Sequence, residues 1–399
     1  GHVTLETGAL QLRLTTSEVK GNLTIAAGAA VSNHGTITVD GATDIDANGG
    51  ASNILLNSYT NDLTGTVSLD GWNVRVTNGK AIELGTIDSR ALVVTARGAV
   101  TQTVPSVITT VGASNITAQN SAGDTDYDVT LYNAANDFQG DLKITARNVR
   151  VRDTNGVDLA LSDVSGTYYL VARGAVIDSG ALAITGAATI IAQSSDGSTY
   201  HDITLDDTSH NFGTISVIGK IVQLVDAGAI ELGASTVTGT YAVTATASGD
   251  ITNSGVLDIS SAATFTAAAG QQVILGSDNI FGGTVTFSTV GDTGSLKNVT
   301  VTDTTTLDLT ALTLAQVSSA GGNLTVTAGG ALTDTGPLII PGTTTITATG
   351  QSVVLNNTSN NFGTILFGSS SNAVSSVEVE DTNAIEIGTS KSTGDFKVT

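Results

Sequence analysis

Three short phrases return in the same order along this chain at intervals of about 75 residues. In the first phrase an acid stands in an apolar run such as AIELG, and successive acids are 75, 73, 77 and 78 residues apart. These acids are Glu83, Asp158, Glu231, Asp308 and Glu386. Self-similarity at a fixed period of this length is the signature of repeat architectures. The chain is therefore predicted to be an array of one repeated unit.

The other two phrases set the boundaries of the copies. One phrase places an Asn before Leu or Phe, as in NDFQGDL at 136–142, and the other closes each copy, as in AVIDSG at 175–180. They divide the chain at about 1–35, 36–104, 105–180, 181–255, 256–336 and 337–399. The first and last copies are partial, so we expect the array to continue in both directions.

The apolar pattern within a copy alternates with period two over short runs. Examples are NVRVRD at 148–153, TISVIG at 214–219 and NVTVTD at 298–303, with Gly, Asn, Asp and Ser between runs. Such runs indicate strands, and no window has the spacing of an amphipathic helix. We predict an all-β chain that coils as one continuous right-handed parallel β-helix, a β-solenoid, over 1–399. At roughly 20 to 25 residues per turn and ~4.8 Å between turns, it would form a rod of roughly 80 to 95 Å.

A string of immunoglobulin-like β-sandwiches is the competing all-β fold. The chain has a single Trp, Trp72, and only three prolines, so most copies lack a large aromatic anchor and none is followed by a Pro-rich linker. These features favour the solenoid.

A comparison between copies separates interior from exterior positions. Five pairs keep two apolar residues at fixed spacing around a residue that changes from copy to copy. The pairs are Val74 and Val76, Val149 and Val151, Val222 and Leu224, Val299 and Val301, and Val377 and Val379. Because side chains alternate faces along a strand, the constant positions should face the core and the variable ones water.

Composition excludes several classes of function. A net charge of -21 disfavours nucleic acid and anionic membrane surfaces as partners. Without Cys there is no disulfide framework and no thiolate metal site, and no apolar run is long enough to insert in a bilayer. The absence of Cys and Met fits a location outside the cell.

Two acidic turns are candidate calcium sites. DIDANGG at 44–50 places Asp44, Asp46 and Asn48 at the spacing that opens an EF-hand loop, but the twelfth position is Leu55 instead of Glu. DTDYD at 124–128 supplies Asp124, Asp126 and Asp128. The last of these corresponds to Asn53 and Asp202 in neighbouring copies. We expect no cofactor other than a possible calcium ion.

The recurring Asn of the second phrase is interpreted as a turn residue beside a hydrophobe that fills the bend. The pairs are Asn61 with Leu63, Asn136 with Phe138, Asn211 with Phe212, Asn279 with Phe281, and Asn361 with Phe362. The four histidines, His2, His34, His201 and His210, have no partner pattern. His201 and His210 lie in turns of one copy without counterparts in the others and are predicted to lie on the surface.

No catalytic motif is present. The chain lacks G-x-S-x-G, a P-loop and H-E-x-x-H, and its acids are spread evenly instead of gathered at one groove. We therefore predict that it is not an enzyme and has no catalytic residue. The recurring acid of the first phrase, from Glu83 to Glu386, is interpreted as a solvated outward carboxylate.

Phrases such as HDITLDDTSHNFGTISVIG and AIELGASTVTGTYAVTATASGDITNSG resemble the β-strand repeats of large filamentous-haemagglutinin-like exoproteins of Gram-negative bacteria. The resemblance covers essentially the whole chain and implies export through an outer-membrane secretion partner, display at the cell surface, and a role in adhesion or biofilm. It carries over no binding residue.

The leading functional hypothesis is a structural shaft that projects a distal tip of a bacterial surface adhesin. Two alternatives are a self-assembling extracellular filament, sheath or surface-layer subunit, and a β-helix that binds or cleaves polysaccharide. Partners would then be host or surface glycans, or other copies of the chain.

Overall fold

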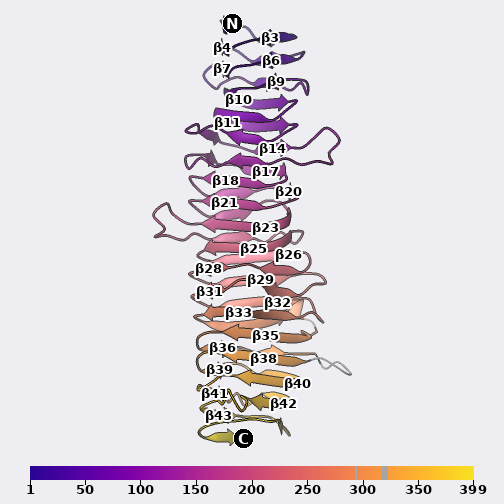
Figure 1. The fold of residues 1–399 in the computed structure, drawn as a ribbon, viewed down its shortest axis with the longest axis vertical. Coiled ribbons are helices and arrows are strands. Elements are labelled where there is room, and N and C mark those ends of the chain that lie inside the picture. Colours follow the sequence, from indigo (N-terminus) through magenta and orange to yellow (C-terminus); the bar gives the residue numbers. More distant parts are fainter. Residues whose placement is uncertain (293, 316–321) are drawn as a thin grey trace. The chain divides into compact units, whose positions relative to one another are not determined.

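A computed structural model describes residues 1–292, 294–315 and 322–399, and these residues are almost entirely strands and turns. The chain divides into two compact units, Gly1–His201 and Asp202–Thr399. Within each unit, short strands follow one another around a common core and stack turn upon turn (Figure 1).

The strands of unit 1 are mostly three to six residues long. They are β1 (Val3–Thr7), β2 (Leu12–Leu14), β3 (Ser17–Val19), β4 (Leu23–Ala27), β5 (Val31–Asn33), β6 (Ile37–Val39), β7 (Thr43–Ala47), β8 (Ile54–Leu56), β9 (Asp62–Leu63), β10 (Thr66–Asn78), β11 (Ile82–Ala96), β12 (Val100–Gln102), β13 (Ile108–Thr110), β14 (Ser114–Ala118), β15 (Val129–Leu131), β16 (Asp137–Phe138), β17 (Asp141–Ala146), β18 (Val149–Asp153), β19 (Val157–Leu159), β20 (Ser162–Val164), β21 (Tyr168–Ala172), β22 (Val176–Asp178) and β23 (Leu182–Ala192).

Unit 2 continues in the same style. Its strands are β24 (Ile203–Leu205), β25 (Asn211–Gly219), β26 (Val222–Asp226), β27 (Ile230–Leu232), β28 (Ser235–Val237), β29 (Tyr241–Ala245), β30 (Ile251–Asn253), β31 (Leu257–Ile259), β32 (Ala263–Ala267), β33 (Val273–Phe281), β34 (Thr284–Thr289), β35 (Asn298–Asp303), β36 (Leu307–Leu309), β37 (Leu312–Thr313), β38 (Asn323–Ala328), β39 (Leu332–Asp334), β40 (Leu338–Thr347), β41 (Ser352–Leu355), β42 (Asn361–Phe367), β43 (Ser376–Val379), β44 (Glu386–Ile387) and β45 (Phe396–Val398). One 3₁₀ turn spans Val290–Asp292.

The strands of each unit pair in parallel with strands one turn away. In unit 1, β1 pairs with β4 and β4 with β7, so that Val3, Leu23 and Thr43 lie in one column at intervals of 20 residues. In unit 2, β26, β29 and β32 stack in the same way, with Tyr241 paired to Val222 and to Ala263. This is the parallel β-solenoid that the sequence predicts, and the sandwich alternative, which needs antiparallel sheets, is wrong.

The core is made by the apolar positions that stay constant between copies. All ten residues of the five Val and Leu pairs named above are at most 2% exposed. The residues between them, such as Arg75, Arg150 and Gln223, are exposed. The predicted division between interior and exterior is therefore confirmed, and it follows from the alternation of side chains along a strand.

Corresponding strands of successive copies do not always occupy the same column. β17 pairs with two shorter strands of the next turn, β19 and β20, and β25 likewise pairs with β27 and β28. One column of stacked strands thus splits into two columns in each copy. As a result, residues that correspond in sequence can lie in different columns. Val74 pairs with Ile54 of β8, whereas its counterpart Val149 pairs with Val129 of β15, which belongs to another column.

In the described residues the structure contains no α-helix, as the sequence analysis predicts. The described part of the chain therefore has no helix with the length and apolar character needed to cross a membrane.

Candidate functional site

A buried polar side chain lies two residues before the corner hydrophobe in every copy. These residues are Asn61, Asn136, His210, Asn279 and Asn360, each at most 1% exposed. In three copies this residue is the Asn predicted from the second phrase, but in the other two the predicted residues, Asn211 and Asn361, are not the buried ones. Both of those lie one residue too close to Phe, and because strand side chains alternate they face outward.

The buried Asn of the second phrase bonds to the polar residue of the third phrase in the preceding turn. Asn61 accepts a hydrogen bond from the Asn33 amide at 2.8 Å, and Asn279 accepts one from Asn253 at 2.8 Å. Asn136 exchanges two bonds with Gln102, at 2.7 and 2.9 Å. These two phrases recur together because they are the two halves of one contact between turns.

The rest of the Asn amide satisfies the backbone of the corner. In Asn136 the side-chain oxygen also accepts the backbone N–H of Ile108 at 3.0 Å, and the amide nitrogen donates to the Leu131 carbonyl at 3.1 Å. A buried backbone group without a hydrogen-bond partner is unfavourable. The Asn136 amide supplies such partners at the corner, so the chain can turn there without leaving these two groups unsatisfied.

A second buried side chain, an Asp that the sequence analysis missed, holds the backbone of the corner Phe. Asp153 accepts the N–H of Phe138 at 2.7 Å and that of Asn155 at 2.6 Å. The same pair of bonds recurs in the other copies at Asp226, Asp303 and Asp381. In the first copy the neutral Asn78 accepts from Leu63 in their place. The signal was present as a D closing VRVRD, VQLVD and VTVTD.

Burial makes these aspartates unusual acids. Asp153 is 1% exposed, and desolvation raises its pKa to about 6 although two backbone N–H groups act in the opposite direction. Desolvation also raises the pKa of Asp226 and of Asp303. At Asp153 and Asp303 no basic side chain compensates for this burial, whereas at Asp226 the nearby His210 acts to lower the pKa. In each of these copies the carboxyl group lies against the core and has a structural role.

The first calcium candidate does not gather its oxygens at one point. Asp44 and Asp46 lie on β7 with exposed side chains, and Asn48 begins the following turn in a left-handed conformation with φ of 61°. Asp46 accepts the N–H of Gly49 at 2.6 Å, which closes that turn. The register places Asp46 beside Asp70 of β10, so the contact is between turns.

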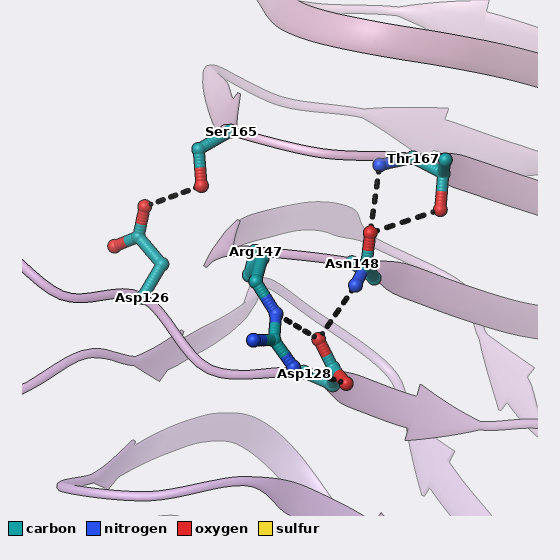
Figure 2. Close-up of polar contacts among 6 residues, drawn as sticks. All are labelled: Asp126, Asp128, Arg147, Asn148, Ser165 and Thr167. Carbon is teal, nitrogen blue, oxygen red and sulfur yellow. Dashed lines mark hydrogen bonds and ion pairs between the residues drawn. The ribbon is translucent and has the colours of Figure 1, made fainter.

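The second candidate is occupied by protein groups (Figure 2). Arg147 donates two bonds of 2.9 Å to Asp128, which also accepts the Asn148 amide, and Asp126 accepts the hydroxyl of Ser165 at 2.7 Å. Arg147 lowers the pKa of Asp128. Asp124 accepts from Asn120 within its own loop. Across the described residues no three His, Cys, Asp or Glu side chains form a group suited to a metal ion.

Asp128 stands immediately before the first residue of β15. In other copies, too, the side chain at this position forms a hydrogen bond to the next turn. Asn53 accepts the N–H of Asn73, and Asp202 accepts the N–H of Ile221. In unit 2 a longer ladder runs through Asp250, Gln272, Asn298 and Asn323 to Thr343. The correspondence between Asn53, Asp128 and Asp202 noted in the sequence is therefore structural.

The recurring acids of the first phrase face outward. Glu83 and Glu386 are exposed, and Asp158, Glu231 and Asp308 are partly exposed. Each is paired across the ladder with a residue of the preceding turn, as Glu83 is with Thr66, whose hydroxyl donates to the carboxylate at 3.1 Å. Their role on the surface agrees with the sequence interpretation.

Of the four histidines, His2 and His34 are exposed, and His201 is partly exposed, as predicted for it. The surface assignment of His210 is wrong, because it takes the interior position that Asn holds in the other copies. Its ring lies 5.1 Å from that of Phe212, centroid to centroid.

Aromatic rings paired with guanidinium groups line three shallow hollows of unit 1, and the sequence analysis did not single them out. Arg90 lies over Trp72 at 5.1 Å from the ring centroid, and Arg97 lies over Tyr59 at 5.0 Å. The third hollow adjoins Arg150, Arg152, Tyr132 and Tyr169. These residues come from different turns, so only the stacking brings them together.

A search of curated proteins and a search of solved structures found no match to this chain. The family described as Repeats of unknown function (DUF5649) matches five consecutive segments, 1–70, 71–145, 146–218, 219–288 and 296–367. These segments have the period predicted from the three phrases, with a different choice of first residue. Because they cover most of the sequence, the chain belongs to this family of repeats of unknown function.

Proposed function

We propose that the chain is a shaft segment of a large secreted or surface-anchored bacterial adhesin, which holds a distal tip away from the cell. The observation that carries the proposal is that the recurring polar residues form hydrogen bonds between turns. In each copy with a buried Asn, they join one turn to the next, as Asn136 joins Gln102 and as Asp153 joins Phe138. What the repeat preserves is the coupling between turns.

Such coupling suits a part that transmits force. In a repeat array each turn contacts mainly its neighbours, so stiffness depends on the bonds between adjacent turns. Buried side-chain bonds add to the parallel ladder without exposing polar groups to water. The proposal includes a location at the cell surface, which the resemblance to filamentous-haemagglutinin-like exoproteins suggests.

Electron microscopy of the purified chain over a concentration series tests the proposal. We expect separate elongated particles whose length stays the same at every concentration and close to the roughly 80 to 95 Å given by ~4.8 Å per turn. Filaments that lengthen with concentration would favour the self-assembling alternative. Compact particles would contradict both.

A further inference from the structure

Arginine is confined to one part of this acidic sequence. All eight arginines lie between Arg13 and Arg173, while the net charge of the chain is -21. Two of them, Arg150 and Arg152, are two residues apart on β18 and so project from the same, outer face of that strand. Their positive charges therefore reinforce each other locally.

Two tyrosines from the neighbouring turns lie against this pair of arginines. Arg150 is paired in the ladder with Thr130 of β15 on one side and with Tyr169 of β21 on the other. Its Cζ lies 3.8 Å from the ring centroid of Tyr132 and 5.7 Å from that of Tyr169, and the Arg152 Cζ lies 4.9 Å from Tyr132. The ring faces hold the guanidinium groups in place.

Neither guanidinium has a carboxylate partner among the residues that the structure describes. The acids close by in sequence are engaged elsewhere, since Asp128 binds Arg147 and Asp153 accepts the backbone of Phe138. The Nε of Arg152 is buried and has no hydrogen-bond acceptor in the described chain. A buried donor left in this state is unfavourable.

A hollow of about 480 Å³ opens beside this cluster, within the size range of small-molecule sites. Its rim carries Asp128, Thr130, Asn148 and Thr167 together with Arg150 and Tyr169, whereas the apolar Val129 and Val149 beneath are buried. The Asp128 carboxylate is paired with Arg147 and the Asn148 amide, so its charge is balanced within the protein. The hollow thus offers hydroxyl, guanidinium and aromatic groups beside a carboxylate that Arg147 neutralises, and it has no apolar anchor pocket.

We propose that Arg150, Arg152, Tyr132 and Tyr169 form a binding site for an anionic saccharide. The planar guanidinium fork matches a carboxylate or sulfate group, and the tyrosine and threonine hydroxyls are suited to hydrogen bonds with sugar hydroxyls. A protein partner would need a central apolar pocket, which this surface lacks. The site adds a contact on the shaft itself and does not depend on the proposed shaft role.

Calorimetric titration of the full chain with oligogalacturonate, with its fully methyl-esterified form and with a heparin-derived oligosaccharide tests the site. We expect the anionic oligosaccharides to bind and the neutral ester to bind at least about tenfold more weakly, since it offers no charge to the guanidinium groups. The R150A/R152A variant should lose at least about tenfold in affinity. The ratio of the two anionic affinities distinguishes carboxylate from sulfate as the preferred group.

Arg75→Ala is the matched control. Arg75 is the counterpart of Arg150 in the sequence of the preceding copy and is exposed, but it lies in a different column, where its ladder neighbours are Leu55 and Val93 instead of aromatic residues. Its loss should leave the affinity unchanged. The R150K/R152K variant keeps both charges and both stems, so it should fold normally and still bind weakly, because Lys lacks the planar fork.

Equal binding of the ester, or unchanged binding by R150A/R152A, would overturn the proposal. So would a concentration-dependent dimer that these substitutions abolish without any saccharide binding, because the occupant would then be a second copy. Each result is independent of particle length in the microscope, so failure of this site and failure of the shaft role are distinguishable.

Discussion

Replacing Asp153 with Asn should remove a defined part of the pH dependence of stability. Asp153 is buried, and its pKa in the folded chain is raised to about 6 from an ordinary value of 3.8. The folded state therefore prefers the protonated group. This preference stabilises the fold fully below about pH 4 and is lost as the pH rises through about 6.

The size of the effect follows from the shift. A difference of about 2 pKa units corresponds to about 2 to 3 kcal/mol between the two ends of the window. Asn keeps the oxygen that accepts the Phe138 N–H but carries no charge, as Asn78 shows by accepting from Leu63 at 2.9 Å in the first copy. The D153N variant also loses the hydrogen bond from the Asn155 N–H to the second carboxylate oxygen, and the free-energy cost of that loss is the same at every pH.

Urea unfolding followed by circular dichroism at pH 4, 5, 6 and 7 measures the effect. Stability of D153N relative to the parent chain should rise by about 2 to 3 kcal/mol from pH 4 to pH 7, while the other titrating groups cancel in the difference. The reciprocal substitution Asn78→Asp places a carboxyl at the buried counterpart and should lower relative stability over the same window. A flat difference in both variants would refute the reasoning.

Four further substitutions test the packing by thermal unfolding. Asn360→Ala breaks buried bonds to Asp334 and to the Leu338 N–H and should cost about 2 to 4 kcal/mol, whereas Asn361→Ala should cost less than about 0.5; equal losses would show that the buried position is misassigned. Phe265→Ala removes a ring packed 6.1 Å from Tyr241 and should cost about 3 to 5 kcal/mol, so a loss below about 1 would mean that this core is loosely packed. Gly255→Ala places a Cβ 2.1 Å from the backbone nitrogen of Ala234 and should cost about 1 to 3 kcal/mol, and an unchanged melting temperature would rule out the close approach.

The error at the second phrase shows how far comparison between copies can reach. NFGTI at 211 and at 361 matches NDFQGDL best when Asn is aligned with Asn, yet the interior position is His210 in one copy and Asn360 in the other. Alignment by residue type fails here because His replaces Asn and because Asn stands at both positions of 360–361. If the copies are instead aligned on the corner hydrophobe, the residue two positions before it is the buried one in every copy, since strand side chains alternate.

By itself the sequence determined the repeat, the parallel β-solenoid and the interior positions of those strands that keep an apolar pair in every copy. These follow from periodicity, because an alternating pattern with unchanged apolar positions leaves one way to bury them. Only the tertiary structure decided which polar residues meet. Stacking brings Asn136 to Gln102 across 34 residues and Arg150 to both Tyr132 and Tyr169, and the column in which each strand lies depends on where a column splits. That split depends on the length of every turn before it, which no local pattern encodes.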